Sequence, residues 1–226
     1  MGDLAIFSMY GLDFLSRWIH LLGGITWIGL LYYFNFVQTE YFKEADPAHR
    51  AGAIQKLVPR ALWWFRWGAM LTFLSGVALL AYKGSGITYA ITIGSILGTL
   101  MFLNVWLIIW PNQKIVIASA NAVAEGNEPL PEAAAAAPKA ALASRTNTLF
   151  SAPMLFMMFA SGHLVSDSMN LLVAASGASI ASVLVVIILL EINAIFGKQG
   201  PLTSVTGVIH CSLGLTAVLY LLMALL

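Results

Sequence analysis

The sequence predicts an all-α membrane protein, a single transmembrane domain over residues 1–226 built as a bundle of about six transmembrane helices. Of its residues 60% are hydrophobic and only 9% are charged, whereas a soluble domain carries roughly a quarter charged residues. The mean hydropathy is +0.86. Several apolar runs reach the length of about 20 residues that a bilayer-spanning helix needs. Because irregular backbone cannot face lipid, each of these runs is expected to be a helix surrounded by membrane lipid.

Polar breaks divide the apolar sequence into six expected spans. They cover residues 12–37, 58–82, 87–111, 147–167, 171–195 and 202–226. The first span lacks a small-residue cleavage site, so it is expected to remain as a helix and not to be removed as a signal peptide. The longest break, 112–146, has a low-complexity centre at 132–138, which predicts a short surface helix or a linker.

The positions of the lysines and arginines predict the orientation. Eight of them lie in or beside the first, third and fifth breaks, and two lie at the opposite ends of the spans. The eight are Lys43, Arg50, Lys56, Arg60, Lys114, Lys139, Arg145 and Lys198, and the two are Arg17 and Lys83. Since positive charge concentrates in cytoplasmic loops, the 112–146 loop is expected in the cytoplasm of a bacterial inner membrane. Both termini are then periplasmic.

Two function classes are excluded by charge and cysteine content. The net charge of +1 gives no basis for nucleic-acid binding. The single cysteine, Cys211, allows neither a disulfide framework nor a CxxCH site for covalent haem within this chain.

Histidine at membrane depth is the strongest functional signal. A protonatable residue there is costly, so His20 in the first span is a functional candidate by default, and a haem iron is its most common partner. By helix rise, His20 lies about 9–12 Å and His163 about 6 Å from the periplasmic ends of their spans. These similar depths predict that the two are axial ligands of one b-type haem.

Other interpretations of the histidines and of Arg17 remain open. His20 or His163 could instead bond a neighbouring serine or backbone carbonyl and be purely structural. His210 lies at another depth and is the reserve ligand, while His49 is expected to be solvated in a charged break. Arg17 is on the same helix face as His20, where it could meet haem propionates or extend to the membrane interface.

A second deep charge is Arg66, which lies between Trp63, Trp64 and Trp67. It either forms an ion pair with Glu191 or belongs to an anion-binding or proton-handling site. For the anion-binding interpretation, a guanidinium can bind an anionic heterocycle through two hydrogen bonds while indoles stack on it. Asn104 and Asn147 are also polar at span depth and are expected to form cross-helix hydrogen bonds or to line a pocket.

Four segments of the sequence carry a family resemblance. They are RWIH at 17–20 with GITWIG at 24–29 and YYF at 32–34; LWWFRW at 62–67 with TFLSG at 72–76; NV at 104–105 with IWPNQ at 109–113; and NTLFSAP at 147–153 with LFM at 155–157. In order and spacing they resemble the membrane domain of bacterial membrane-bound urate hydroxylases. The first segment is also similar to copper-resistance membrane proteins and to the membrane haem protein that oxidises protoporphyrinogen.

The resemblance implies a multi-helix membrane domain that oxidises urate to hydroxyisourate and passes the electrons to a cytochrome c. Because this chain has no CxxCH, the expected partner is a separate cytochrome c or a respiratory complex. Two other classes remain open. One is a copper or small-molecule permease with a soft-metal path of His20, His163, Met154, Met157 and Met158, since imidazole and thioether suit Cu(I). The other is a non-redox structural subunit of a membrane complex.

Overall fold

The computed structural model describes residues 5–164 and 175–226, and within these ranges the regular structure is entirely helical. The helices are η1 (Ala5–Phe7), α1 (Met9–Tyr32), η2 (Tyr33–Gln38), α2 (Thr39–Glu44), α3 (Pro47–Gly52), η3 (Ala53–Leu57), α4 (Val58–Lys83), η4 (Gly84–Gly86), α5 (Tyr89–Leu103), η5 (Asn104–Ile109), α6 (Trp110–Ala124), α7 (Ala133–His163), α9 (Gly177–Phe196), η7 (Gly200–Thr203) and α10 (Val205–Leu225). In the described ranges, five continuous helices are long and apolar enough to cross a membrane. The predicted all-α polytopic membrane bundle is confirmed.

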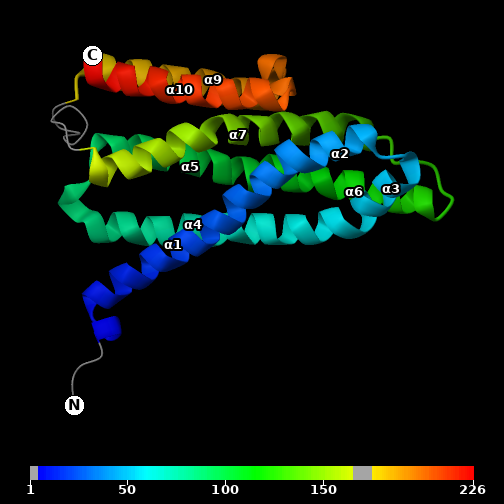
Figure 1. The fold of residues 1–226 in the computed structure, drawn as a ribbon, viewed down its shortest axis with the longest axis horizontal. Helices are drawn as coiled ribbons and strands as arrows, with labels where there is room; N and C mark the ends of the chain where they lie inside the picture. Colours follow the sequence, from blue (N-terminus) through cyan, green and yellow to red (C-terminus); the bar gives the residue numbers. More distant parts are fainter. Residues whose placement is uncertain (1–4, 165–174) are drawn as a thin grey trace.

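Successive long helices run in opposite directions and form three packed groups (Figure 1). α1 crosses α4, the continuous helix of α5, η5 and α6 packs along α7, and α9 and α10 form a pair that also contacts α7. The start of α1 and the end of α10 lie at the same end of the bundle. The turns at 45–46 and 125–132 lie at the other end.

The long helices extend well beyond the expected spans. Residues in the expected breaks 39–59 and 112–146 are mostly helical, and the helix Pro47–Gly86 has 40 residues. At 1.5 Å per residue this helix is about 60 Å long, roughly twice the hydrocarbon thickness. Polar residues end a membrane span but do not end a helix, so the helices continue out of the apolar zone. The expected turn at 167–170 lies outside the described residues.

The alanine-rich segment at 132–138, predicted as a short surface helix or a linker, is helical from Ala133 and mostly exposed, but it continues into a long helix. It forms the start of α7, and Ala136, Ala140 and Ala143 are buried along one face of that helix. Alanine is the strongest helix former and allows close approach, so this face packs against α6.

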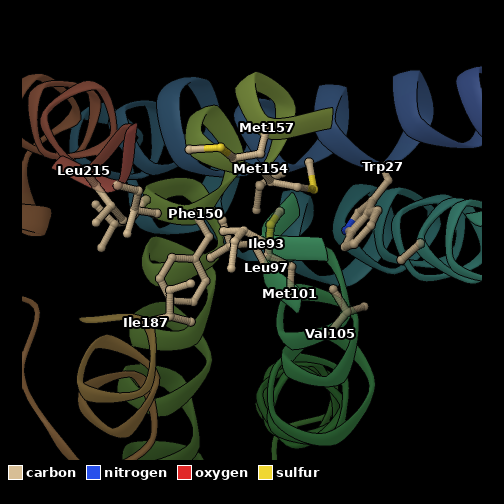
Figure 2. Packing of buried hydrophobic residues seen from close by; sticks show 14 of the residues in the cluster. Trp27, Ile93, Leu97, Met101, Val105, Phe150, Met154, Met157, Ile187 and Leu215 are labelled. Carbon is tan, nitrogen blue, oxygen red and sulfur yellow. The ribbon is translucent and has the colours of Figure 1, made fainter. Parts of the chain in front are cut away.

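α7 is the central helix of the bundle. Its side chains Phe150, Met154 and Met157 are buried against Leu97 of α5 and its neighbours, with Ile187 of α9 on the other side (Figure 2). α7 is not among the five helices selected by length and hydropathy. Its hydropathy is lowered by a run of buried polar residues, Thr146, Asn147, Thr148 and Ser151. These can be accommodated because this part of α7 is buried against other helices.

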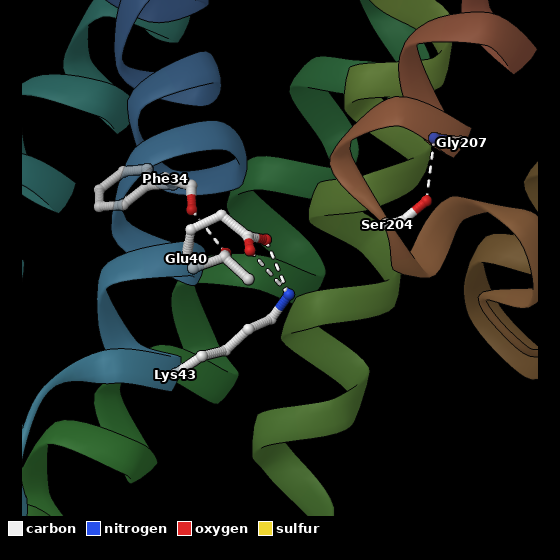
Figure 3. Close-up of polar contacts among 6 residues, drawn as sticks. Phe34, Glu40, Lys43, Ser204 and Gly207 are labelled. Atoms are coloured by element: carbon white, nitrogen blue, oxygen red, sulfur yellow. Dashed lines mark hydrogen bonds and ion pairs between the residues drawn. The ribbon is translucent and has the colours of Figure 1, made fainter.

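Three π-helical segments, η2, η3 and η5, interrupt the long helices. π-helix is rare and is found frequently at functional sites. At the end of η2, the Thr39 hydroxyl donates at 2.7 Å to the carbonyl oxygen of Phe34, which also accepts the backbone N–H of Thr39 (Figure 3). A similar local bond begins α10, where Ser204 accepts from the backbone N–H of Gly207 at 2.9 Å (Figure 3).

α1 and α4 are in backbone contact. A Cβ atom added to Gly23 would lie 3.0 Å from the backbone nitrogen of Thr72, and one added to Gly68 would lie 3.1 Å from that of Trp27. Small residues at such crossings let two membrane helices approach closely. This contact determines the position of the first candidate site.

Candidate functional site

His20 projects from α1 onto α4. Its Nδ1 atom lies 2.9 Å from the carbonyl oxygen of Thr72 and 3.2 Å from Oγ of Ser75. Because a carbonyl can only accept, the Nδ1 atom carries the proton, and in the neutral ring Nε2 is then the unprotonated nitrogen. Metal-binding histidines generally have this arrangement, in which one ring nitrogen donates to a fixed acceptor and the other binds the metal.

Gly76 provides the space for the His20 ring. A Cβ atom at Gly76 would lie 3.1 Å from Cε1 and 3.5 Å from Nδ1 of His20. The half-buried imidazole is therefore held by a hydrogen bond on one edge and limited by the α4 backbone on another. The bond to Thr72 also fits the purely structural interpretation of His20. The same bond orients the ring so that Nε2 is free to bind a metal.

His163 is exposed at the C-terminal end of α7. Its ring centroid is 5.8 Å from that of Phe159, and both side chains line a shallow, open depression with Phe156, Ala160 and Leu164. Two residues before it, Ser161 Oγ lies 3.1 Å from the Thr88 hydroxyl and 3.4 Å from Nζ of Lys83.

These contacts place the two predicted haem ligands at different levels of the bundle. His163 lies beside the turn that follows Lys83, whereas His20 is bonded to Thr72. Lys83 and Thr72 are eleven residues apart on α4, which corresponds to about 16 Å along the helix axis. The structure therefore does not bring His20 and His163 together on one iron.

The other candidate ligands and partners are separate from His20. Arg17 forms an exposed ion pair with Asp13, with Nε 2.8 Å from Oδ2. His210 is exposed on α10. His49 is exposed and bonds the carboxylate of Asp46 at 2.6 Å, as expected of a solvated residue.

The methionines of the predicted copper path are packing residues in this structure. Met154 and Met157 are 4% and 0% exposed, and together with Met158 they fill the space beside Gly94 and Gly98 of α5. Within residues 5–164 and 175–226, no group of three or more histidine, cysteine or acidic side chains could hold a metal ion.

Arg66 lies in an aromatic cage, although not the one that the sequence predicts. Its guanidinium carbon is 3.9 Å from the ring centroid of Trp110, 5.7 Å from that of Trp106 and 5.8 Å from that of Trp67. The other two expected neighbours, Trp63 and Trp64, are 47% and 60% exposed. The sequence could not reveal Trp106 and Trp110 because the helix that carries them is distant in the chain.

Two donors in this cage have no hydrogen-bond acceptor among the described residues. They are the buried Nε atom of Arg66 and the buried indole nitrogen of Trp106. Stacked indoles favour a cation, and unpaired N–H groups favour an acceptor that carries negative charge. The cage is thus chemically suited to an anionic, planar ligand.

The predicted ion pair between Arg66 and Glu191 does not form. Glu191 Oε2 instead accepts a hydrogen bond of 3.2 Å from Nδ2 of Asn104, and that same nitrogen donates to Oδ1 of Asn147 at 3.0 Å. Nδ2 of Asn147 donates to the carbonyl oxygen of Met101 at 2.9 Å. The expected cross-helix role of Asn104 and Asn147 is confirmed. η5 lies between the Arg66 cage and the Glu191 cluster. It contributes Trp106 to the cage and Asn104 to the cluster.

A polar seam between α1 and α7 escaped the sequence analysis. The Tyr32 hydroxyl is 2.9 Å from Oγ of Ser151, and Nδ2 of Asn35 donates to Oγ of Ser144 at 2.8 Å. Arg145, counted only as a loop charge, is 4% exposed, and its Nη1 atom has no acceptor in the described part of the chain. The polar residues that follow it, Thr146, Asn147 and Thr148, are the signal in the sequence for a buried helix face at the start of α7.

Residues 82–193 match the family described as urate oxidase N-terminal. The chain is therefore similar to a urate-oxidase-like family over just under half of its length, from the end of α4 to near the end of α9. No curated protein and no solved structure gives a significant match.

The urate oxidase-like segment contains some of the candidate residues and not others. It includes Asn104, Asn147, Glu191 and His163, and it extends into the fifth span, beyond the segments that carried the resemblance at 17–157. His20 and Arg66 precede it, whereas Trp106 and Trp110 of the Arg66 cage lie within it.

Proposed function

We propose that this chain is the haem-bearing membrane unit of a urate-hydroxylase-like oxidoreductase that works in periplasm-facing electron transfer. Electrons would leave it to a separate cytochrome c or a respiratory complex. The observation that carries the proposal is the hydrogen bond from Nδ1 of His20 to Thr72, which leaves Nε2 of the neutral ring unprotonated in a largely apolar helix. The similarity to a urate-oxidase-like family supports the substrate class.

A b-type haem would be held by His20, and when bound it would supply reversible one-electron oxidation and reduction. Thr72 and Ser75 would fix the orientation of the ring, and Gly76 would leave room for it. His163 does not fit as the second ligand in this arrangement of helices, so the proposal assigns His20 alone. Arg17 could serve a propionate only by leaving Asp13, which is inexpensive because exposed ion pairs contribute only about 0–1 kcal/mol.

The substrate would bind at Arg66. The Nε atom of Arg66 and the indole nitrogen of Trp106 are buried and unpaired, and they would donate to an anionic purine that enters between the guanidinium and its aromatic neighbours. Arg66 is six residues from Thr72 on α4, about 9 Å along the helix axis. The proposed haem and substrate sites are therefore separated by only about 9 Å in depth along α4.

An absorption spectrum tests the proposal directly. Protein purified in detergent from haem-replete cells should show the Soret and visible absorption bands of a b haem, and these bands should shift on reduction with dithionite. Urate should then reduce this haem when a cytochrome c acceptor is supplied. A colourless preparation would rule out the redox function. If the protein holds haem but urate does not reduce it, urate oxidation is ruled out and the electron-relay function remains.

A further inference from the structure

Glu191 is the centre of a polar cluster that the proposed redox function does not use. It is half-buried on α9, five residues before the helix ends at Phe196, which is about 8 Å along the axis. Its partner Asn104 is 1% exposed, and Asn147 behind Asn104 is fully buried. The cluster joins three helical segments, η5, α7 and α9, within the apolar part of the bundle.

Glu191 has no cationic partner in the described ranges. The ion pairs found there join Arg17 to Asp13, Lys43 to Glu40 and His49 to Asp46. The helices packed against α9 carry Lys139, Arg145 and His163 on α7 and His210, Cys211 and Tyr220 on α10, and Lys198 follows α9 in the sequence. In the described part of the chain, none of these side chains bonds Glu191. η5 contributes no titratable group. A carboxylate at membrane depth without a cation is costly, and uptake of a proton removes its charge.

The hydrogen-bonding capacity of Asn104 fits both protonation states of the carboxyl group. In the arrangement described, its Nδ2 atom donates to Glu191 as to a carboxylate, while its buried Oδ1 atom has no partner among the described residues. A protonated Glu191 would still accept this bond through its carbonyl oxygen, and Nδ2 of Asn104 would keep its bond to Oδ1 of Asn147. The contact with Asn104 is therefore compatible with both charge states of the carboxyl group.

We propose that Glu191, Asn104 and Asn147 form a proton-binding site inside the membrane part of the bundle. The proton is held on the Glu191 carboxyl group and is exchanged with water at the end of the bundle where α9 turns into α10. Asn104 is a positioning residue that stabilises the ionised carboxylate, and Asn147 holds the Asn104 amide. Asn104 begins the π-helical segment η5, a type of irregularity that is often associated with functional sites. The inference depends neither on haem nor on urate.

Labelling with an apolar carbodiimide tests this site, since the reagent attaches covalently to protonated carboxyl groups. In the full-length protein in liposomes, mass spectrometry of peptides should find Glu191 labelled about tenfold more than the exposed Glu125 near pH 7, and labelling should fall as the pH rises. Glu191→Gln should abolish the label. Equal labelling of Glu191 and Glu125 would overturn the proposal, and this measurement needs no variant to fold.

A matched pair of variants tests the role of Asn104. Asn104→Leu removes the donor to the carboxylate, so the decline in labelling should move to higher pH. Asn112→Leu is the control, because Asn112 lies on the same continuous helix and bonds only to the Ile108 carbonyl oxygen. A sodium salt should leave the labelling of Glu191 unchanged. Protection by sodium would instead identify an alkali-cation site and would contradict the assignment to a proton.

Discussion

The Nδ1 atom of His20 lies 2.9 Å from the backbone carbonyl oxygen of Thr72, which joins α1 to α4 and fixes the tautomer of the ring. The bond has two consequences. It satisfies one polar atom of a side chain that would otherwise be costly at membrane depth, and it leaves the other ring nitrogen as a potential ligand. A structural histidine and a metal-binding histidine differ here only in what Nε2 contacts.

The first prediction distinguishes these two roles. His20→Ala should abolish the haem spectrum of the purified protein, because the assigned iron ligand is lost. His163→Ala should leave the spectrum unchanged, since the contacts of Ser161 place His163 at another level of the bundle. His49→Ala serves as the exposed control. Loss of the haem bands in both His20→Ala and His163→Ala would instead show that the two residues share the iron, and would require α7 to sit deeper against α1.

The helix crossing beneath His20 gives a prediction about stability. Gly23→Ala should destabilise the protein by about 1–3 kcal/mol, because the added methyl group would meet Thr72 atoms at 3.0 Å or closer. Gly24→Ala, one residue along the same helix, has nothing within 4 Å of the added atom and should cause no loss. Thermal unfolding in detergent followed by circular dichroism compares the two variants. An equal loss in both would mean that α1 and α4 are not in backbone contact.

The sequence predicts the helices better than it predicts the sites. Apolar runs long enough to span a bilayer identify α1, α4, α5, α9 and α10, because burial in lipid imposes one composition on the whole helix. α7 is also predicted, but its polar residues Asn147 and Ser151 do not reveal that it is the central helix. The positions of Trp106 and Trp110 around Arg66 depend on contacts between distant segments, which no local pattern encodes.

The same limit explains the two histidines. Their depths were estimated by counting from expected span ends, and those ends were uncertain because helices continue through polar segments. A single contact, from Ser161 to Thr88, gives the level of His163 directly. Likewise, Glu191 and Arg66 are opposite charges in the second and fifth expected spans, yet η5 lies between them and each contacts other residues.

The start of α3 gives a prediction about pH. Hydrogen bonds from the backbone N–H and the ring of His49 hold the pKa of Asp46 below its usual range. A carboxyl group with a lowered pKa in the folded state stabilises that state above its unfolded pKa of about 3.9. This contribution is lost as the pH falls through the lower, folded value. Amide exchange of residues 47–52 should therefore accelerate below about pH 4.

Asp46→Asn tests the cause of that acceleration. Asparagine keeps the cap on α3 but cannot ionise, so exchange of residues 47–52 should lose its dependence on acid pH. An unchanged acid dependence in Asp46→Asn would assign the effect to another group.

The orientation in the membrane can be tested with reporters. The turn at 125–132 and the C-terminal end of α10 lie at opposite ends of the bundle (Figure 1). With most positive charge near the turn, a reporter that is active only in the periplasm should work after Leu226 and fail within 125–132. The opposite pattern would invert the protein and remove the basis for a periplasmic cytochrome partner.

The last prediction concerns the substrate. Arg66→Lys keeps the positive charge but loses the planar guanidinium, whose Nε atom is the unpaired donor in the cage of Trp67, Trp106 and Trp110. If an anionic purine binds there, urate-dependent haem reduction should fall by about tenfold or more, which corresponds to loss of one charge-assisted hydrogen bond. The haem spectrum should stay normal because His20 is untouched. Arg60→Lys is the control on the same helix, outside the cage. A wild-type rate in Arg66→Lys would move the substrate away from this cage, and a lost haem spectrum would show that Arg66 supports the fold and not the substrate.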